Sequence, residues 1–197
     1  MDIAYRRGEK EDCKKIAEMV NIASDGVLDY LFHDLVPGMT PLQLLAHNLG
    51  KDHYPHTYKS VVVACDDNNI VGAALSYPSS YHKITDGLKN FLPAERLEQF
   101  RDYYESRVEN SWFLDAMGVA ASHRKRGIGE RLISLTKEKA VKNGYQSLSL
   151  IVLTDNVVAI PLYQRCGFEV VKNINVQRNE FIKHDGGCFL MQCDIRP

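Results

Sequence analysis

Apolar positions recur along this chain with two different periods, and the shorter period predicts strands. An apolar run at residues 60–65, a polar turn at 66–69 and a second apolar run at 70–77 together predict a β-hairpin. Further stretches of the same type lie at residues 3–6, 112–119, 147–153, 169–176 and 187–195. The chain is therefore expected to form a sheet of about six or seven strands.

Apolar positions three and four residues apart predict helices between these strands. The first opens at residues 9–12 and carries Ile16, Met19, Val20 and Ala23, and helical pieces and loops fill residues 25–58, with a break at Pro37-Gly38 and a new start after Thr40-Pro41. A longer helix runs from about Ile128 to Lys142-Asn143-Gly144, where a cation followed by glycine is a usual stop signal. Another helix starts near Val158, because Pro161 fits only a first helical turn.

Residues 78–110 separate the third and fourth predicted strands, and they read as a helical insertion. Pro93 is suited to the first turn of a helix, and Leu97, Phe100, Tyr104 and Val108 then fall on one face. The aliphatic positions of that face are expected to pack on the rest of the protein. The tyrosines of the insertion, together with Tyr81, are the better candidates for contacts with a ligand.

The composition narrows the class of protein. The 197 residues suffice for one sizeable core, so residues 1–197 are expected to form a single domain. The formal net charge of −1 provides no field that would attract nucleic acid or an anionic membrane. Five scattered cysteines without Cys-x-x-Cys spacing, and no signal peptide or spanning segment, favour a cytoplasmic protein. His53 and His56 share a stretch without neighbouring ligands, and no metal site is expected.

One turn combines glycines with cations at the start of a predicted helix. The sequence Arg124-Lys125-Arg126-Gly127-Ile128-Gly129 follows the strand that ends at Val119. The first N–H groups of a helix have no internal partner, and with the positive end of the helix dipole they attract anions. Glycine lets the backbone approach a ligand closely. The turn therefore predicts a phosphate site, although a plain strand-turn-helix connection would look similar.

A second segment follows the first in the order and at the distance seen in one enzyme family. It runs from Asn156 through Ala159, Leu162 and Tyr163 to Gly167-Phe168. With Arg124-x-x-Gly127-x-Gly129, the chain resembles the GNAT-type N-acetyltransferase superfamily. The resemblance is firm over about residues 111–170 and poor over residues 78–110.

The resemblance implies a fold and a cosubstrate. The fold would be of the α/β class, with a GNAT-like mixed, mostly antiparallel sheet, helices on both faces and the helical insertion between the third and fourth strands. Acetyl-CoA would be the acetyl donor, with its pyrophosphate on the turn at residues 124–129 and its pantetheine along Asn156 and the strand residues Met117, Gly118 and Val119.

The chemistry of amine acetylation adds two requirements that the predicted fourth strand could meet. An amine must lose its proton before it attacks, and a donor must stabilise the oxygen of the thioester as charge develops there. Family resemblance places the N–H of Met117 or Gly118 as that donor. Asp115 shares a face with Phe113 and Met117 by the two-residue period. It could be the general base or amine anchor, or equally a strand carboxylate paired with a cation, and Glu180 and His184 are alternatives.

Tyr163 is the candidate donor to the departing sulfur. A phenol stays protonated at neutral pH, and the family presents a tyrosine at this position to the sulfur. The alternative is a half-buried core tyrosine. Asn156 precedes the helix and could cap it, bind pantetheine, or do both through different atoms.

Together these observations predict an acetyl-CoA-dependent N-acetyltransferase that works by direct attack in a ternary complex. The acceptor is expected to be a small-molecule amine, with a peptide or protein amine as the alternative. A noncatalytic acyl-CoA-binding module is a third hypothesis. No nucleic-acid or membrane partner is expected, and a homodimer stays open.

Overall fold

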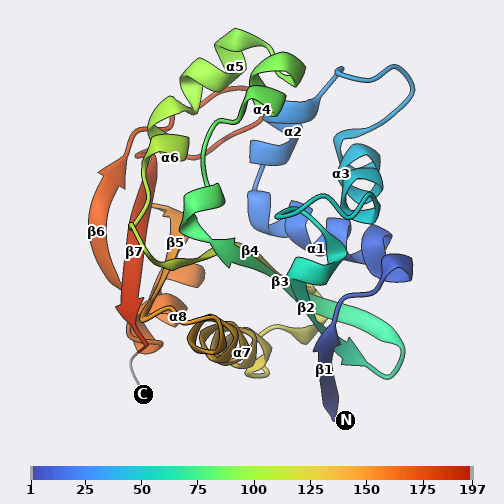
Figure 1. Cartoon of the computed structure of the whole chain (residues 1–197), viewed down its shortest axis with the longest axis vertical. Helices are drawn as coiled ribbons and strands as arrows, with labels where there is room; N and C mark the ends of the chain where they lie inside the picture. The colour runs from blue at the N-terminus through green and yellow to red at the C-terminus, as the bar shows by residue number, and fades with distance from the viewer. Residues whose placement is uncertain (1, 196–197) are drawn as a thin grey trace.

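The computed structural model describes residues 2–195 and contains one seven-stranded sheet (Figure 1). The strand order is β1-β2-β3-β4-β5-β7-β6, and every neighbouring pair is antiparallel except β4 and β5. This confirms the mixed, mostly antiparallel sheet expected from the sequence. The strands are β1 (Ile3–Arg7), β2 (Val61–Asp66), β3 (Asn69–Pro78), β4 (Trp112–Val119), β5 (Ser147–Leu153), β6 (Glu169–Ile174) and β7 (Cys188–Asp194).

Helices cover both faces of the sheet, as Figure 1 shows. On one face, α1 and α3 bury their apolar sides against β2, β3 and β4. On the other face, α7 and α8 pack against the centre of the sheet. The described α-helices are α1 (Cys13–Ser24), α2 (Val27–Phe32), α3 (Pro41–Gly50), α4 (Asp86–Phe91), α5 (Ala94–Gln99), α6 (Arg101–Glu105), α7 (Ile128–Lys142) and α8 (Ala159–Arg165). Short 3₁₀ turns are η1 (Lys10–Asp12), η2 (Tyr58–Ser60), η3 (Ser79–Tyr81) and η4 (Ala121–His123).

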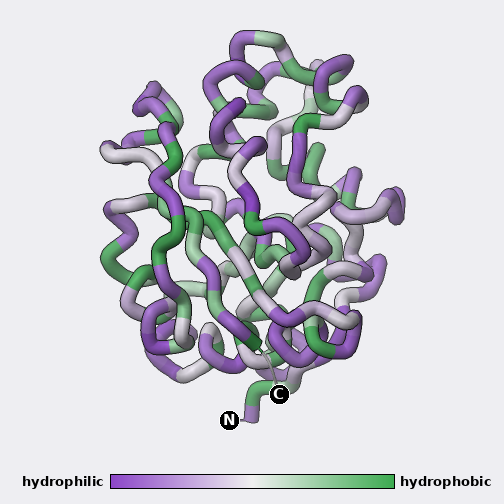
Figure 2. Tube along the Cα trace, turned by 60° about the vertical axis from the view of Figure 1, so that its left-hand side comes forward, coloured by the Kyte–Doolittle hydropathy of each residue, from purple (hydrophilic) through white to green (hydrophobic). Residues whose placement is uncertain are grey.

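Local chemistry explains where several of these helices start and stop. Thr40 and Gln43 form a capping box at the start of α3, each side chain bonding the other's backbone N–H. Gly144, just beyond α7, has a φ of 84°, the left-handed conformation that glycine adopts without strain. The predicted start near Val158 is confirmed, since α8 begins at Ala159. Hydrophobic segments gather in the strands and polar segments in the outer helices and loops (Figure 2).

The insertion is helical, as expected, but it contains three short helices, α4, α5 and α6. The single face predicted from Leu97 to Val108 is interrupted at Phe100, whose φ and ψ of −104° and 12° lie between α5 and α6. Leu97 and Phe100 are buried in a third apolar cluster with residues of α2, β5, β6 and β7. The insertion therefore packs on the body of the protein, beside α2.

The most consequential irregularity is the parting of β4 and β5. These two strands pair only from Trp112 to Leu114, opposite Leu148 to Leu150. Beyond Leu114 the strands diverge and leave one edge of β4 without a neighbouring strand. A β-bulge lies at the same place, because Leu75 pairs with Ala116 whereas Ser76 pairs with Leu114. Asp115 is thus the extra residue of β4.

The bulge corrects one prediction about side-chain direction. Strict alternation placed Asp115, Phe113 and Met117 on one face. Phe113 does face α1 and α3, but Met117 packs in the cluster on the α7 side. One extra residue reverses the alternation of the strand, so the two-residue period holds only up to the bulge.

Candidate active site

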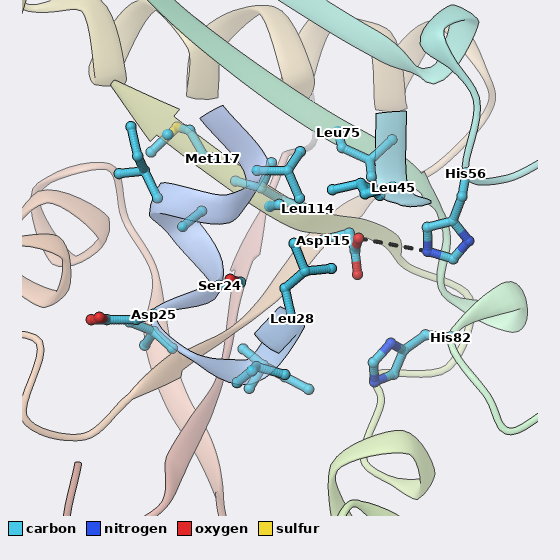
Figure 3. A pocket seen from close by; sticks show the side chains of 18 of the residues that line it. Ser24, Asp25, Leu28, Leu45, His56, Leu75, His82, Leu114, Asp115 and Met117 are labelled. Carbon is cyan, nitrogen blue, oxygen red and sulfur yellow. Dashed lines mark ion pairs between the residues drawn. The ribbon is translucent and has the colours of Figure 1, made fainter. Parts of the chain in front are cut away.

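A large cleft opens where β4 and β5 part. Its volume is about 2210 Å³, and its lining comes from both faces of the sheet. One end holds the start of α7 and α8. The other end is enclosed by α2, α3, the 3₁₀ turn η3 and the insertion helix α4. Figure 3 shows Asp115 and Met117 of β4 in the cleft, with Ser24 of α1, Leu28 of α2 and the intervening Asp25 beside them.

The turn that leads into α7 has the backbone conformation of an anion site. Gly127 precedes the helix with a φ of 77°, and Lys125 is also left-handed, with a φ of 59°. A lysine in that conformation is strained, and such strain concentrates at functional sites. Together they turn the chain so that α7 starts at the cleft, where its first N–H groups have no helical partner.

The three cations of this turn differ in position. Arg124 and Lys125 line the cleft, whereas Arg126 does not. The Nε of Arg124 donates to the carbonyl oxygen of Val119 at 3.1 Å, which ties the turn to the end of β4. Arg124 and Lys125 therefore fit the expected phosphate contact, and Arg126 supplies charge from outside the cleft.

Gly129 and Gly118 are explained by close packing. A Cβ on Gly129 would lie 3.0 Å from Leu162, which lets α8 sit directly beside the start of α7. A Cβ on Gly118 would lie 2.0 Å from the carbonyl oxygen of Met19 in α1. The close approach at Gly118 is therefore to the backbone of α1.

Backbone direction separates the two candidate oxyanion donors in β4. Ala120 donates its N–H to Val71 of the β3 side at 2.8 Å. Because backbone groups alternate along an antiparallel pair, those of Gly118 face β3 and those of Met117 and Val119 face away from it. The Val119 carbonyl confirms this direction through its bond with Arg124. The N–H of Met117 therefore points to the edge of β4 that has no neighbouring strand, because β5 pairs with β4 only as far as Leu114.

Asn156 and Tyr163 bracket the start of α8. The side-chain oxygen of Asn156 accepts from the N–H of Ala159 at 2.9 Å, so this residue caps the helix. Its amide NH₂ group stays available to a ligand in the cleft, which it lines. Tyr163 also lines the cleft, with its ring edge against Phe168, and burial raises its pKa to about 12. Tyr163 is thus both a core residue and a cleft residue.

Asp115 is held by two neighbours in the other half of the cleft. The hydroxyl of Tyr77 donates to its Oδ1 at 2.8 Å, and the Nε2 of His56 lies 3.7 Å from its Oδ2 (Figure 3). The Tyr77 ring is buried, and burial together with the Asp115 charge raises the pKa of its phenol well above the usual value. The carboxylate is 19% exposed and the imidazole of His56 is 50% exposed. This arrangement connects a half-buried carboxylate with solvent through a histidine.

His82 lies below this pair in Figure 3 and is almost fully buried. Its Nε2 lies 2.9 Å from the carbonyl oxygen of Tyr103. A carbonyl can only accept, so Nε2 carries the proton and the neutral ring offers Nδ1 as an acceptor. Burial lowers the pKa of His82, which keeps the ring neutral at neutral pH.

Comparison with known proteins agrees with the architecture. Residues 29–168 match the model of the acetyltransferase (GNAT) family. The chain belongs to the GNAT acetyltransferase family. It is therefore an acetyl-CoA-dependent acyltransferase, from a family that acetylates amines.

Solved structures resemble the whole of this GNAT chain. An acetyltransferase with 26% sequence identity matches with a TM-score of 0.67, over 98% of this chain and 100% of that one. An N-acetyltransferase from Staphylococcus aureus Mu50 matches at 20% identity and a TM-score of 0.63, over 97% and 99%. PaiA N-acetyltransferase from Thermoplasma acidophilum, solved with coenzyme A, matches at 14% identity and 0.55, over 98% and 99%.

The GNAT cleft brings together nearly all the residues expected to hold acetyl-CoA. Those that line it are Met117, Gly118, Val119, Arg124, Lys125, Gly127, Ile128, Gly129, Asn156 and Tyr163. Ile128 is buried in the core, so only its backbone could meet a ligand. Tyr81, Tyr103 and Tyr104 line the opposite half, so the expected ligand contacts of these tyrosines stay a prediction.

The two alternatives to Asp115 in this GNAT enzyme are placed differently. Glu180 is exposed and does not line the cleft. His184 does line it, but both ring nitrogens are engaged, by Asp155 at 2.9 Å and by Asp25 at 3.1 Å. Burial alone would lower the pKa of His184, but the two carboxylates outweigh it and raise the pKa. His184 therefore acts as an ionic link between loops.

Sequence reasoning did not find the side chains that lie around Asp115, namely His56, Tyr77 and His82. His56 was considered only as a metal ligand, and in the described residues no group of three potential ligands lies together. Tyr77 could have been found from the sequence, because it ends an apolar strand of a hairpin that pairs with β4.

No helix among residues 2–195 is long and apolar enough to cross a bilayer.

Proposed function

We propose that this enzyme transfers the acetyl group of acetyl-CoA to the primary amine of a small molecule by direct attack in a ternary complex. The observation that carries the proposal is the continuity of the cleft, which joins the anion turn of α7 to the enclosed chamber around Asp115. The two substrates could then meet on the unpaired edge of β4.

Acetyl-CoA would be held from the α7 and α8 side. Arg124, Lys125 and the outward N–H groups after Gly127 suit its pyrophosphate. The amide NH₂ group of Asn156 suits a pantetheine carbonyl, since its oxygen already caps α8. The backbone groups of Met117 and Val119 could pair with pantetheine as an added strand would.

The acceptor amine would approach from the Asp115 side. Asp115 attracts the ammonium form and takes up or passes on its proton, and the half-exposed His56 beside it offers a route for that proton to water. The neutral nitrogen then attacks the thioester carbon. The N–H of Met117 would stabilise the oxyanion, and the Tyr163 hydroxyl would donate a hydrogen bond to the sulfur as the C–S bond breaks.

Thiol release from acetyl-CoA with a panel of small primary amines tests this proposal. At least one amine should give turnover well above hydrolysis. Asp115→Asn should reduce kcat/KM by about 10²–10⁴-fold near neutral pH, the range for a lost acid–base group. The loss should shrink as pH rises, because more of the amine is then neutral without help.

Asp194→Asn is the control, because Asp194 ends β7 and does not line the cleft. This variant should keep wild-type turnover. Turnover only with peptides or proteins, and with none of the small amines, would make the acceptor a protein amine. If the factor by which Asp115→Asn lowers kcat/KM is the same at every pH, Asp115 takes no part in proton transfer.

A further inference from the structure

The acceptor half of the cleft combines one available carboxylate with an apolar wall formed by three helices, although polar side chains such as His47, Asn48, Lys51 and Lys83 also line the cleft. Leu28, Leu31 and Phe32 of α2, Leu44 and Leu45 of α3, and Phe91 of α4 line it. In Figure 3 the Asp115 carboxylate lies between His56 and the side chains of Leu28, Leu45 and Leu75. A ligand whose amine reaches Asp115 would therefore place the rest of its body against hydrocarbon.

The other carboxylates of the cleft are already paired with basic side chains. Asp25 and Asp155 both contact His184, and Glu130 lies 3.5 Å from Arg165. Asp115 differs, because its close partner is the neutral phenol of Tyr77 and His56 is more distant. Among the described lining residues, Asp115 is thus the carboxylate available to one ammonium group.

Exposed apolar side chains gather at the same half of the cleft. Tyr54 and Tyr81 are 50% and 45% exposed and form an edge-to-face pair with ring centroids 4.8 Å apart. Phe91 is 42% exposed and lies against Phe32, at a centroid distance of 6.4 Å. Exposed aromatic groups beside a pocket are typical of a site that binds an apolar ligand.

The charged groups beside these rings disfavour a polycation. Lys51 and Lys83 line the same cleft and are exposed. They would repel a second ammonium group, and desolvating that group against leucine side chains without a partner would be costly.

We infer, on the basis of the proposed function, that the acceptor is a primary monoamine with an apolar or aromatic body. Its single ammonium group binds at Asp115, and its body lies along α2, α3 and α4. Polyamines match this surface less well, because they need several unpaired carboxylates, and amino sugars match it less well, because the wall from α2, α3 and α4 presents hydrocarbon to the body of the ligand.

Matched pairs of amines test the inference. With saturating acetyl-CoA, kcat/KM should rise about fourfold for each methylene from butylamine to hexylamine, as burial of a CH₂ group predicts. Hexylamine should exceed 1,6-diaminohexane by roughly 100-fold, because the diamine buries an unpaired charge. 2-Phenylethylamine should likewise exceed glucosamine.

A substitution at an exposed wall position should change this preference. Phe91→Glu should lower kcat/KM for hexylamine and raise it for 1,6-diaminohexane, with the KM for acetyl-CoA unchanged. Val141→Glu is the matched control, because Val141 is 41% exposed, close to the 42% of Phe91, but lies on α7 outside this cleft. The control should leave the preference unchanged.

Binding separates failure of this inference from failure of the proposed function. In the presence of coenzyme A, hexylamine should raise the melting temperature more than the diamine does, whether or not thiol is released. Equal or better use of the diamine, of glucosamine or of a peptide N-terminus would overturn the apolar monoamine while leaving an acetyltransferase. The inference would also be overturned if Phe91→Glu and Val141→Glu showed the same preference between hexylamine and 1,6-diaminohexane.

Discussion

Asp115 shows how one residue can decide the chemistry of a strand. It is the extra residue of the bulge, because Leu75 and Ser76 of β3 pair with the residues on either side of it. Its carboxylate points to the acceptor half of the cleft, while Met117, two residues on, belongs to the α7 side. In the proposed mechanism the bulge thus directs an acidic side chain toward the amine and a backbone N–H toward the thioester, within three residues of chain.

Tyr163 works as a hydrogen-bond donor in this proposal, because its raised pKa makes it a poor acid. A thiol has a pKa of about 8.5, so full proton transfer from a phenol with a pKa of about 12 would be uphill by roughly 5 kcal/mol. Tyr163→Phe should lower kcat by roughly 10- to 150-fold, the value of one hydrogen bond to a charged group, rather than by the larger factor expected of a full acid.

The pH profile of this variant is the sharper test. Since Tyr163 stays protonated far above neutral pH, the factor by which Tyr163→Phe lowers kcat should be constant between about pH 6 and 9. Acetyl-CoA affinity should be nearly unchanged. Tyr145→Phe, which removes a hydroxyl at the distant end of α7 beside Trp112, is the control. Wild-type turnover by Tyr163→Phe in a chemistry-limited assay would leave Tyr163 as a core residue only.

At the scale of elements, α7 carries the proposed phosphate site at one end and an ordinary helix stop at the other. Gly127 and Gly144 flank the helix with φ values of 77° and 84°. A Cβ at either position would meet no atom within 4 Å, so the two sites differ in neither crowding nor backbone strain. They differ in which end of the helix dipole they border.

Alanine at these two glycines separates binding from stability. A left-handed alanine is strained by about 1–2 kcal/mol, so Gly127→Ala and Gly144→Ala should lower the melting temperature by similar amounts. Only Gly127→Ala should lose most of the further rise in melting temperature that acetyl-CoA gives the wild type, because relief of the strain turns the N–H groups at the start of α7. An equal ligand-induced rise in both variants would move the phosphate site away from this turn.

At the scale of the whole molecule, His184 joins three parts of the chain around the cleft. Asp25 lies between α1 and α2, Asp155 lies between β5 and α8, and His184 lies in the connection from β6 to β7. The two carboxylates favour the charged imidazole and raise its pKa above 6.5. The link is therefore strongest when the histidine is protonated.

The pH dependence of stability should report this link. A raised folded-state pKa contributes stability that is complete below the unfolded value of about 6.5 and is lost as pH rises through the folded value. The melting temperature of His184→Gln should fall furthest below that of the wild type at about pH 5.5, and the gap should narrow by about pH 8.5. His47→Gln, on α3, is the control and should show no such trend. A gap for His184→Gln that widens with pH would contradict the assignment.

Much of the fold could be predicted from the sequence because its signals are local. The positions of the strands, the Thr40-Pro41 start, the Gly144 stop and the first-turn proline of α8 each depend on a few neighbouring residues, and all four match the structure. The glycine turn before α7, to which cosubstrate binding is assigned as a proposal, was predictable for the same reason, since a helix start and its glycines are adjacent in sequence. Insertion helices were harder to delimit, because α5 and α6 are short and depend on packing against α2 and the sheet.

The sequence by itself determined the family, the order of the elements and the turn at the start of α7. Only the tertiary structure decided which side chains surround Asp115. Tyr77 and Asp115 are 38 positions apart, and His56 and Tyr77 are 21 apart, so their meeting depends on strand pairing and on one bulge. A two-residue period assumes an unbroken ladder, and one extra residue in β4 breaks it. The chamber that this creates follows from long-range register, which no local pattern of residues encodes.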